Sequence, residues 1–247
     1  MTALLVAIIV GLSYAVQSTF GFGAGLISLP FLTLLIGAKA SISMNLIFQT
    51  MTGFLLFSVW KDISFKKLPL FLFTVFIGIV CGVLFLNHVS DSTLEVLLGC
   101  YLVFYAGKQM VGHRFPKHEM YTKLKASPLY AIACGFPGGL ISGAFGTGGP
   151  MLVSFVKSMN LPKINMRATI LLVMFYCNVF RVWMAWKTGQ FDKTAITYAL
   201  YALPLFIGGI FCGSIISRIL TESQFKNSIN MIILLAGGSL LIKHFIF

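Results

Sequence analysis

The chain is poor in charge, and above all in acidic residues. Only 10% of its 247 residues are charged, with 6 Asp and Glu against 18 Lys and Arg. None of the acidic residues lies inside an apolar run; they occur at run ends or in loops, at Asp62, Asp91, Glu95, Glu119, Asp192 and Glu222. Membrane pathways for cations and carboxylate proton relays ordinarily use acids at membrane depth. The shortage therefore argues against both functions.

The sequence also lacks a metal-binding, disulfide or catalytic pattern. Its 5 cysteines lie singly in apolar stretches without a Cys-x-x-Cys pair, and its 4 histidines are peripheral. A structural zinc site needs about four ligands at short spacings, and an enzyme needs a positioned acid, base, nucleophile or metal. We therefore expect no metal, no cofactor and no catalytic residue.

Hydrophobic residues, in contrast, are abundant. They make up 58% of the chain, which has 24 Phe and a mean hydropathy of +0.94. This composition predicts an all-α polytopic membrane protein. The basic residues lie singly or in short clusters between apolar runs, so we assign the net charge of +12 to cytoplasmic loops rather than to nucleic-acid binding. Eight hydrophobic segments are expected, over 1–38, 40–60, 68–88, 92–107, 126–156, 164–186, 194–217 and 226–246.

Two glycine-rich motifs interrupt the first segment of each half of the chain. They are Phe20-Gly21-Phe22-Gly23-Ala24-Gly25 and Phe145-Gly146-Thr147-Gly148-Gly149-Pro150. Closely spaced glycines weaken a continuous helix, so we expect two helical arms that meet at an unwound turn in each half. Unwound backbone at membrane depth must be buried by protein or line a polar cavity. Free amides at the start of the second arm would suit an anion there.

The paired motifs indicate a duplicated chain. Gly78-Ile79-Val80-Cys81-Gly82 matches Gly209-Ile210-Phe211-Cys212-Gly213, and Gly78 and Gly82 provide a small face for close helix packing. We predict homologous four-segment repeats over 1–107 and 128–247, joined by a basic cytoplasmic linker over 108–127. If the broken segments cross the membrane, the repeats are parallel; if they turn back as helical hairpins, the repeats are inverted. The distribution of Lys and Arg slightly favours the inverted arrangement.

These features resemble the sulfite exporter family of the TauE/SafE type. The resemblance rests on the two glycine motifs, the four-segment halves and the basic linker, and it covers nearly all 247 residues. It implies a transporter in the cytoplasmic (inner) membrane that moves sulfite, thiosulfate, sulfonates or related small organic anions, mostly outward. The expected partners are the anion and the lipid bilayer, without nucleic acid, and a homo-oligomer is compatible with the sequence.

Neutral polar and basic residues at membrane depth form the predicted substrate site. Arg181 follows an uncharged run, and it either contacts the substrate or a gate, or reaches the interface beside Trp183 and Trp186. For Asn45 and Gln49, which share a helix face, the alternative is interhelical hydrogen bonding. The predicted substrate-binding residues are Gln17, Ser18, Gly21, Gly23, Asn45, Gln49, Ser142, Gly146, Thr147, Gly148, Asn178 and Arg181.

The leading hypothesis is export of a small, sulfur-containing anion through a mid-membrane site between the two broken segments. Movement of one repeat against the other would expose this site alternately. A membrane-embedded enzyme is one alternative, but it needs catalytic groups that the apolar segments lack. An accessory membrane subunit without its own pathway is the other alternative. It fits the composition but leaves the paired polar interruptions unexplained.

Overall fold

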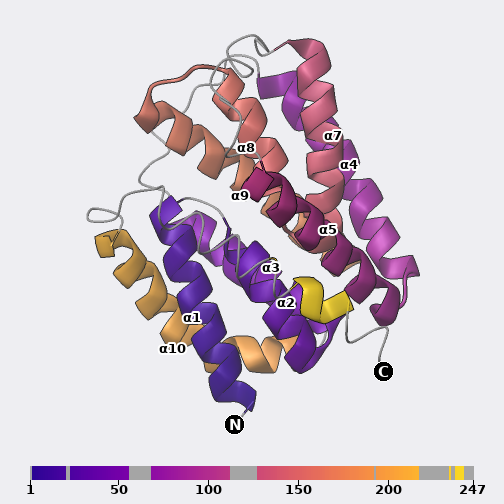
Figure 1. Cartoon of the computed structure of the whole chain (residues 1–247), viewed down its shortest axis with the longest axis vertical. Coiled ribbons are helices and arrows are strands. Elements are labelled where there is room, and N and C mark those ends of the chain that lie inside the picture. Colours follow the sequence, from indigo (N-terminus) through magenta and orange to yellow (C-terminus); the bar gives the residue numbers. More distant parts are fainter. Residues whose placement is uncertain are drawn as a thin grey trace. The chain divides into compact units, whose positions relative to one another are not determined.

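The regular elements in the described part of the chain are all α-helices. The computed structural model describes residues 2–20, 23–55, 68–111, 127–191, 193–216, 234 and 237–241. Within these ranges, five helices are long and apolar enough to cross a membrane, namely α1 (Thr2–Phe20), α4 (Leu68–His88), α7 (Pro128–Phe145), α9 (Lys163–Lys187) and α10 (Lys193–Ile216) (Figure 1). The prediction of an all-α polytopic membrane protein is confirmed at this level. The number of eight segments stays a prediction.

The helix bounds follow the expected segments closely. α4 coincides with the segment at 68–88, and α9 and α10 differ by a residue or so from those at 164–186 and 194–217. α5 spans Asp91–Val111 and thus continues as helix into the beginning of the predicted linker. Linker residues 112–126 lie outside the described residues, as does most of the segment at 226–246.

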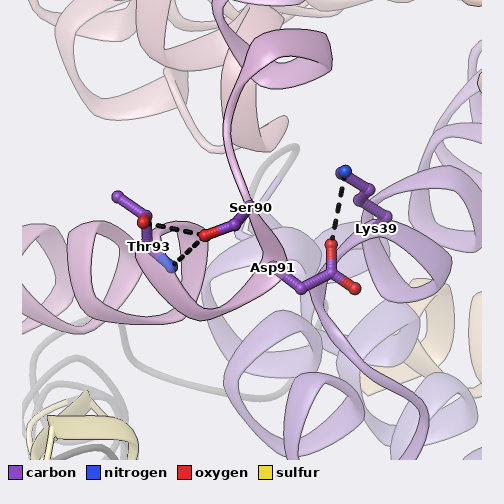
Figure 2. A network of polar contacts seen from close by, with 4 residues as sticks. All are labelled: Lys39, Ser90, Asp91 and Thr93. Atoms are coloured by element: carbon purple, nitrogen blue, oxygen red, sulfur yellow. Dashed lines mark hydrogen bonds and ion pairs between the residues drawn. The ribbon is translucent and has the colours of Figure 1, made fainter.

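Ser90 fixes the start of α5. Its Oγ accepts a hydrogen bond from the backbone N–H of Thr93 at 3.3 Å and lies 2.9 Å from Thr93 Oγ1 (Figure 2). Such a cap is worth about 1 kcal/mol. Asp91 also forms an ion pair with Lys39 at 3.7 Å, near the start of α3 (Ala38–Leu55). These two side chains are 44% and 51% exposed, so water screens their attraction and the pair contributes at most about 1 kcal/mol.

The helices form two compact units, and each combines helices from both predicted repeats. Unit 1 comprises residues 1–45, 89–115 and 191–247, and unit 2 comprises residues 46–88 and 116–190. The boundary between the units therefore falls inside α3. Unit 1 holds α1, α2 (Ala24–Ile36), α5 and α10, whereas unit 2 holds α4, α7, α8 (Gly149–Ser158) and α9.

In unit 2, glycines bring α4 and α7 into backbone contact. A Cβ added to Gly82 would lie 2.8 Å from Ala144 N, and one added to Gly78 would lie 2.8 Å from Leu140 N. Neither distance leaves room for a side chain. Helices in lipid gain little from the hydrophobic effect, so they associate through small residues that allow such close approach. The packing role predicted for Gly78 and Gly82 is confirmed.

In unit 1, α10 meets α1 in the same way. A Cβ on Gly209 would lie 2.9 Å from the carbonyl carbon of Gly11, and one on Gly213 would lie 2.8 Å from that of Ala15. The α1 hydroxyl of Ser18 adds a hydrogen bond of 2.9 Å to the carbonyl of Ile210. The two matching glycine pairs therefore each pack against the helix that precedes a glycine-rich motif (Figure 1).

The second interrupted segment is a helical hairpin. Near the end of α8, the ring of Phe155 lies 6.2 Å from that of Tyr130, which is near the start of α7. Closer to the turn, a Cβ on Gly138 would lie 2.7 Å from Leu152 Cδ2. α8 thus runs back along α7 instead of continuing in its direction. Phe155 also stacks on Phe71 of α4 at 4.1 Å, which fixes the hairpin within unit 2.

The glycine contact in unit 1 predicts different effects at neighbouring positions of α10. Gly209→Ala should lower the melting temperature of the purified protein in detergent, because the new methyl group overlaps α1; overpacking of this kind costs about 1–3 kcal/mol. Gly208→Ala is the matched control, since nothing lies within 4 Å of its Cβ position. It should leave the melting temperature unchanged or raise it. Equal effects at both positions would contradict the close contact of α10 with α1.

Candidate functional site

The second glycine motif breaks the helix between Phe145 and Gly149. Gly146 adopts a left-handed conformation, with φ 76° and ψ 15°, and its N–H donates to the Ser142 carbonyl at 2.8 Å. α8 then starts with the amides of Met151 and Leu152 donating to the Gly148 carbonyl at 3.2 and 3.3 Å. The interruption predicted here is present, and its positive φ explains the glycine.

The first motif also interrupts the helix. α1 ends at Phe20 and α2 begins at Ala24, after Gly23, which has φ 110° and ψ −9°. The Gly23 carbonyl accepts a hydrogen bond from Ile27 N at 3.3 Å. Gly21, the other predicted site glycine of this motif, lies outside the described residues. The two interruptions thus share a left-handed glycine beside a helix end.

Arg181 reaches the second interruption. It lies on α9 with a side chain only 2% exposed, and a Cβ on Gly146 would lie 2.7 Å from its Nη1 and 3.1 Å from its Cζ. The missing side chain at Gly146 therefore makes room for the guanidinium. This burial argues against the interfacial alternative for Arg181, and its contact with a substrate or gate stays a prediction. The guanidinium lies in the interior of unit 2, whereas Trp183 and Trp186 of the same helix are 43% and 73% exposed.

Gln49 connects Arg181 to the broken backbone. Its Nε2 donates to the Gly146 carbonyl at 3.1 Å, and its Oε1 accepts from Arg181 Nη1 at 3.4 Å. The interhelical hydrogen bonding considered for Gln49 is thus present. An amide orients a guanidinium but leaves its positive charge intact. A charge at membrane depth costs several kcal/mol and is a mark of a functional site.

Other predicted residues surround this network in unit 2. Ser142 is buried, and its hydroxyl hydrogen-bonds the thiol of Cys177, one helical turn before Arg181. Gly148 allows the hairpin to close, because its Cβ would lie 2.8 Å from Ser142 N. Thr147 is 3% exposed inside the interruption, and Asn178 is 6% exposed on α9. Cys177 was not predicted; its spacing of four from Arg181 was the available signal.

The remaining predicted residues lie in unit 1 and make different contacts. Ser18 bonds α10, as described above, and Gln17 is half-buried on α1. Asn45 is 1% exposed; its Oδ1 and its backbone carbonyl accept from the hydroxyl of Tyr14 at 2.6 and 3.0 Å. Tyr14 is a polar contact that the sequence reasoning missed, although it precedes Ser18 by one helical turn on α1. The predicted set is thus divided between the two units.

The network in unit 2 is suited to an oxyanion. A guanidinium presents a fork of N–H donors that matches paired oxygen atoms, and its charge shortens and strengthens those hydrogen bonds. The N-terminus of the ten-residue helix α8 lies next to it in the chain and favours negative charge. Among the described residues, no group of three or more His, Cys, Asp or Glu side chains could hold a metal ion. The chemistry offered is recognition of negative charge.

Comparison with known proteins gives one family. Residues 3–240 match the model of the family described as sulfite exporter TauE/SafE. A stretch of 141 residues is 28% identical to a protein of Cupriavidus necator named probable sulfite/organosulfonate exporter TauE. This stretch covers 53% of the chain and 50% of that relative, so the chain spans about half the length of the curated relative it matches. No solved structure matches the chain.

The contact between Gly146 and Arg181 predicts a specific stability effect. Gly146→Ala should lower the melting temperature, because alanine is strained at positive φ and because its methyl group would displace the guanidinium. Gly189→Ala is the control: Gly189 also has a positive φ, of 65°, but nothing lies within 4 Å of its Cβ position. It should show only the backbone strain, about 1–2 kcal/mol. If the two substitutions destabilise equally, the guanidinium does not lie against Gly146.

Proposed function

Because the chain belongs to the sulfite exporter TauE/SafE family, we propose that it exports a small sulfur-containing oxyanion. Sulfite, thiosulfate and short sulfonates are the candidate substrates, and the cytoplasmic membrane is the proposed location. The carrying observation is the buried guanidinium of Arg181 beside the helix interruption at Gly146. The name of the relative from Cupriavidus necator, which mentions sulfite and organosulfonate, supports this substrate class.

The sign of the charge favours an anion over a cation. The acidic residues of the chain are confined to run ends and loops, whereas Arg181 lies within a stretch that is otherwise uncharged from Ala168 to Trp186. A fixed positive charge raises the energy of a nearby cation and lowers that of a nearby anion. A sulfur oxyanion that leaves water also loses hydrogen bonds from its hydration shell. The N–H groups of the guanidinium can replace some of them.

The geometry is also compatible with the shape of sulfur oxyanions. Sulfite, thiosulfate and sulfonates share a sulfur atom that carries several oxygen acceptors on one side. A guanidinium can bind two of these oxygens at once, while the remaining oxygens accept from amide and hydroxyl groups. The fourth position on sulfur then faces the rest of the pathway. It holds a lone pair in sulfite, a second sulfur atom in thiosulfate and a carbon chain in a sulfonate. Because all three anions present the same oxygen atoms to these donors, we propose a class of substrates and not a single anion.

Inverted repeats and alternating access remain part of the proposal. Support comes from the packing of the two matching glycine pairs, since α4 contacts α7 and α10 contacts α1 in the same manner. The observed hairpin of α7 and α8 supports the inverted arrangement. In this proposal the linker at 108–127 lies in the cytoplasm, and movement between the repeats exposes the substrate alternately to the two sides.

The substrate role of Arg181 predicts a loss of transport on removal of its charge. Arg181→Gln in proteoliposomes should reduce sulfite and thiosulfate flux about 10- to 100-fold, the equivalent of one charge-assisted hydrogen bond. Arg181→Lys keeps the charge but loses the fork of donors, so intermediate flux is expected. The measurement is initial efflux from vesicles loaded with radiolabelled anion.

Lys187→Gln is the matched control for this experiment. It removes the same charge from the same helix, but Lys187 is exposed and its ammonium lies 4.5 Å from the centre of the Trp183 ring. Its flux should equal that of the parent. Parental flux in a folded Arg181→Gln protein would exclude Arg181 as a substrate contact. A folded parent that moves none of the sulfur oxyanions would contradict the proposed substrate class.

Access of water to the second interruption distinguishes a transporter from an accessory subunit. In a background without native cysteines, Thr147→Cys should react with a membrane-impermeant, anionic thiol reagent, and a short alkyl sulfonate, which does not consume the reagent, should slow that reaction. The control is Ala202→Cys, because Ala202 of α10 is fully buried. It should stay unlabelled in the folded protein. A silent Thr147→Cys would favour a packed scaffold with no aqueous pathway at this interruption.

A further inference from the structure

Besides the hydroxyl of Thr33, three buried polar groups of unit 1 have no hydrogen-bond partner within the described residues. They are the hydroxyls of Ser13 and Ser28, both 0% exposed, and the Nδ2 group of Asn45, whose residue is 1% exposed. Buried polar groups in native proteins are nearly always paired with protein, water or ligand. Each of these groups therefore requires a partner that is not part of the described chain.

The two serines differ from other buried hydroxyls of the same protein. Within a helix, a serine or threonine hydroxyl ordinarily donates to the carbonyl three or four residues earlier. Ser41 donates to the Gly37 carbonyl at 2.6 Å, and Thr52 donates to the Phe48 carbonyl at 2.8 Å. Ser13 and Ser28 are also helical, yet they make no such bond. Their hydroxyls are free to donate to a group outside the helix backbone.

The three groups lie on α1, α2 and α3 of unit 1. Tyr14, next to Ser13 on α1, donates to Asn45 and thus fixes α3 beside this part of α1. α2 packs against α1 and carries Ser28 in its second turn. The Cα–Cβ bond of a helical residue tilts toward the helix N-terminus, so Ser28 leans toward the interruption at Gly23. α1 therefore contacts both α2, which carries Ser28, and Asn45 of α3.

The hydrogen-bond pattern shows what kind of partner is missing. Oδ1 of Asn45 already accepts from the Tyr14 hydroxyl, so the group without a partner is the Nδ2 donor. A serine hydroxyl can donate as well. Three neutral donors match a ligand that has acceptor oxygens. A metal cation would instead need acceptor oxygens on the protein. The hydroxyl of Thr33, which also lacks a partner, lies toward the other end of α2, away from the first interruption.

We infer that Ser13, Ser28 and Asn45 form a second binding position for the oxygen atoms of the transported anion. This position belongs to unit 1 and uses neutral donors alone, whereas the position in unit 2 uses the guanidinium of Arg181. The inference rests on the proposed function, because it takes the anion from there. The donors replace part of the hydration shell without adding charge, so the anion is bound more weakly here than at Arg181.

The test measures anion binding to two variants and one control. Ser28→Ala removes one donor. Asn45→Asp keeps the oxygen that accepts from Tyr14 but replaces the donor with an acceptor, which repels an anion. Ser41→Ala makes the same change as Ser28→Ala at a buried serine of unit 1 whose hydroxyl is satisfied by its own helix. Thermal shifts of the purified proteins, titrated separately with thiosulfate and sulfite, give the dissociation constants.

We expect Ser28→Ala to weaken binding about three- to tenfold, as for one neutral hydrogen bond, and Asn45→Asp to weaken it further. Ser41→Ala should bind like the parent. Parental dissociation constants in the folded Ser28→Ala variant would overturn the inference and leave the position at Arg181 intact. A lower melting temperature without ligand, together with unchanged anion binding, would show that these groups hold water, which also overturns it.

The design separates this inference from the proposed function. The parent protein alone tests the proposed function: if it neither binds nor transports any anion of the panel, that proposal fails, and this inference fails with it. If the parent binds, the variants test the inference. Should Asn45→Asp not fold, Ser28→Ala decides, because loss of an unpartnered hydroxyl leaves the packing of α2 intact.

Discussion

Arg181 holds a positive charge inside a helix that is otherwise uncharged from Ala168 to Trp186. In a medium of low dielectric constant, such a charge is tolerated only among groups that can accept its hydrogen bonds or carry the opposite charge. The features of unit 2 follow from that requirement. Gly146 lacks a side chain where the guanidinium lies, and Gln49 holds both the guanidinium and the Gly146 carbonyl. The break at Gly146 therefore makes room for the guanidinium, because a side chain at this position would occupy its place.

Close packing of glycines sets the second constraint. In lipid, helices bind each other through contact area and backbone proximity, and the glycines of α4 and α10 provide both. Because these contacts join segments far apart in the sequence, the compact units do not coincide with the predicted repeats. Each unit combines the hairpin region of one half with the third-segment helix of the other. Such an exchange couples the halves, since neither can form its close contact alone.

The sequence predicted the bounds of the helices better than it predicted which helices and side chains contact one another. Glycine spacing predicted both interruptions, and hydropathy predicted the bounds of α4, α9 and α10 to within about a residue. The face of α3 shared by Asn45 and Gln49 was also visible. Their partners were not, because periodicity gives the face of a helix but not the helix that packs on it. Tyr14 and Gly146 accordingly became known as partners only from the structure, as did the burial of Arg181, which hydropathy left open.

An exporter must bind its anion strongly enough to remove water and weakly enough to release it. A cluster of arginines would meet the first demand and fail the second, because each further charge-assisted hydrogen bond adds about 1.5–3 kcal/mol. The described residues combine one guanidinium in unit 2 with neutral donors in unit 1. Each hydrogen bond from a neutral donor contributes less binding free energy than a charge-assisted one. In the proposed transport, the single guanidinium of Arg181 keeps the affinity for the anion at that position moderate.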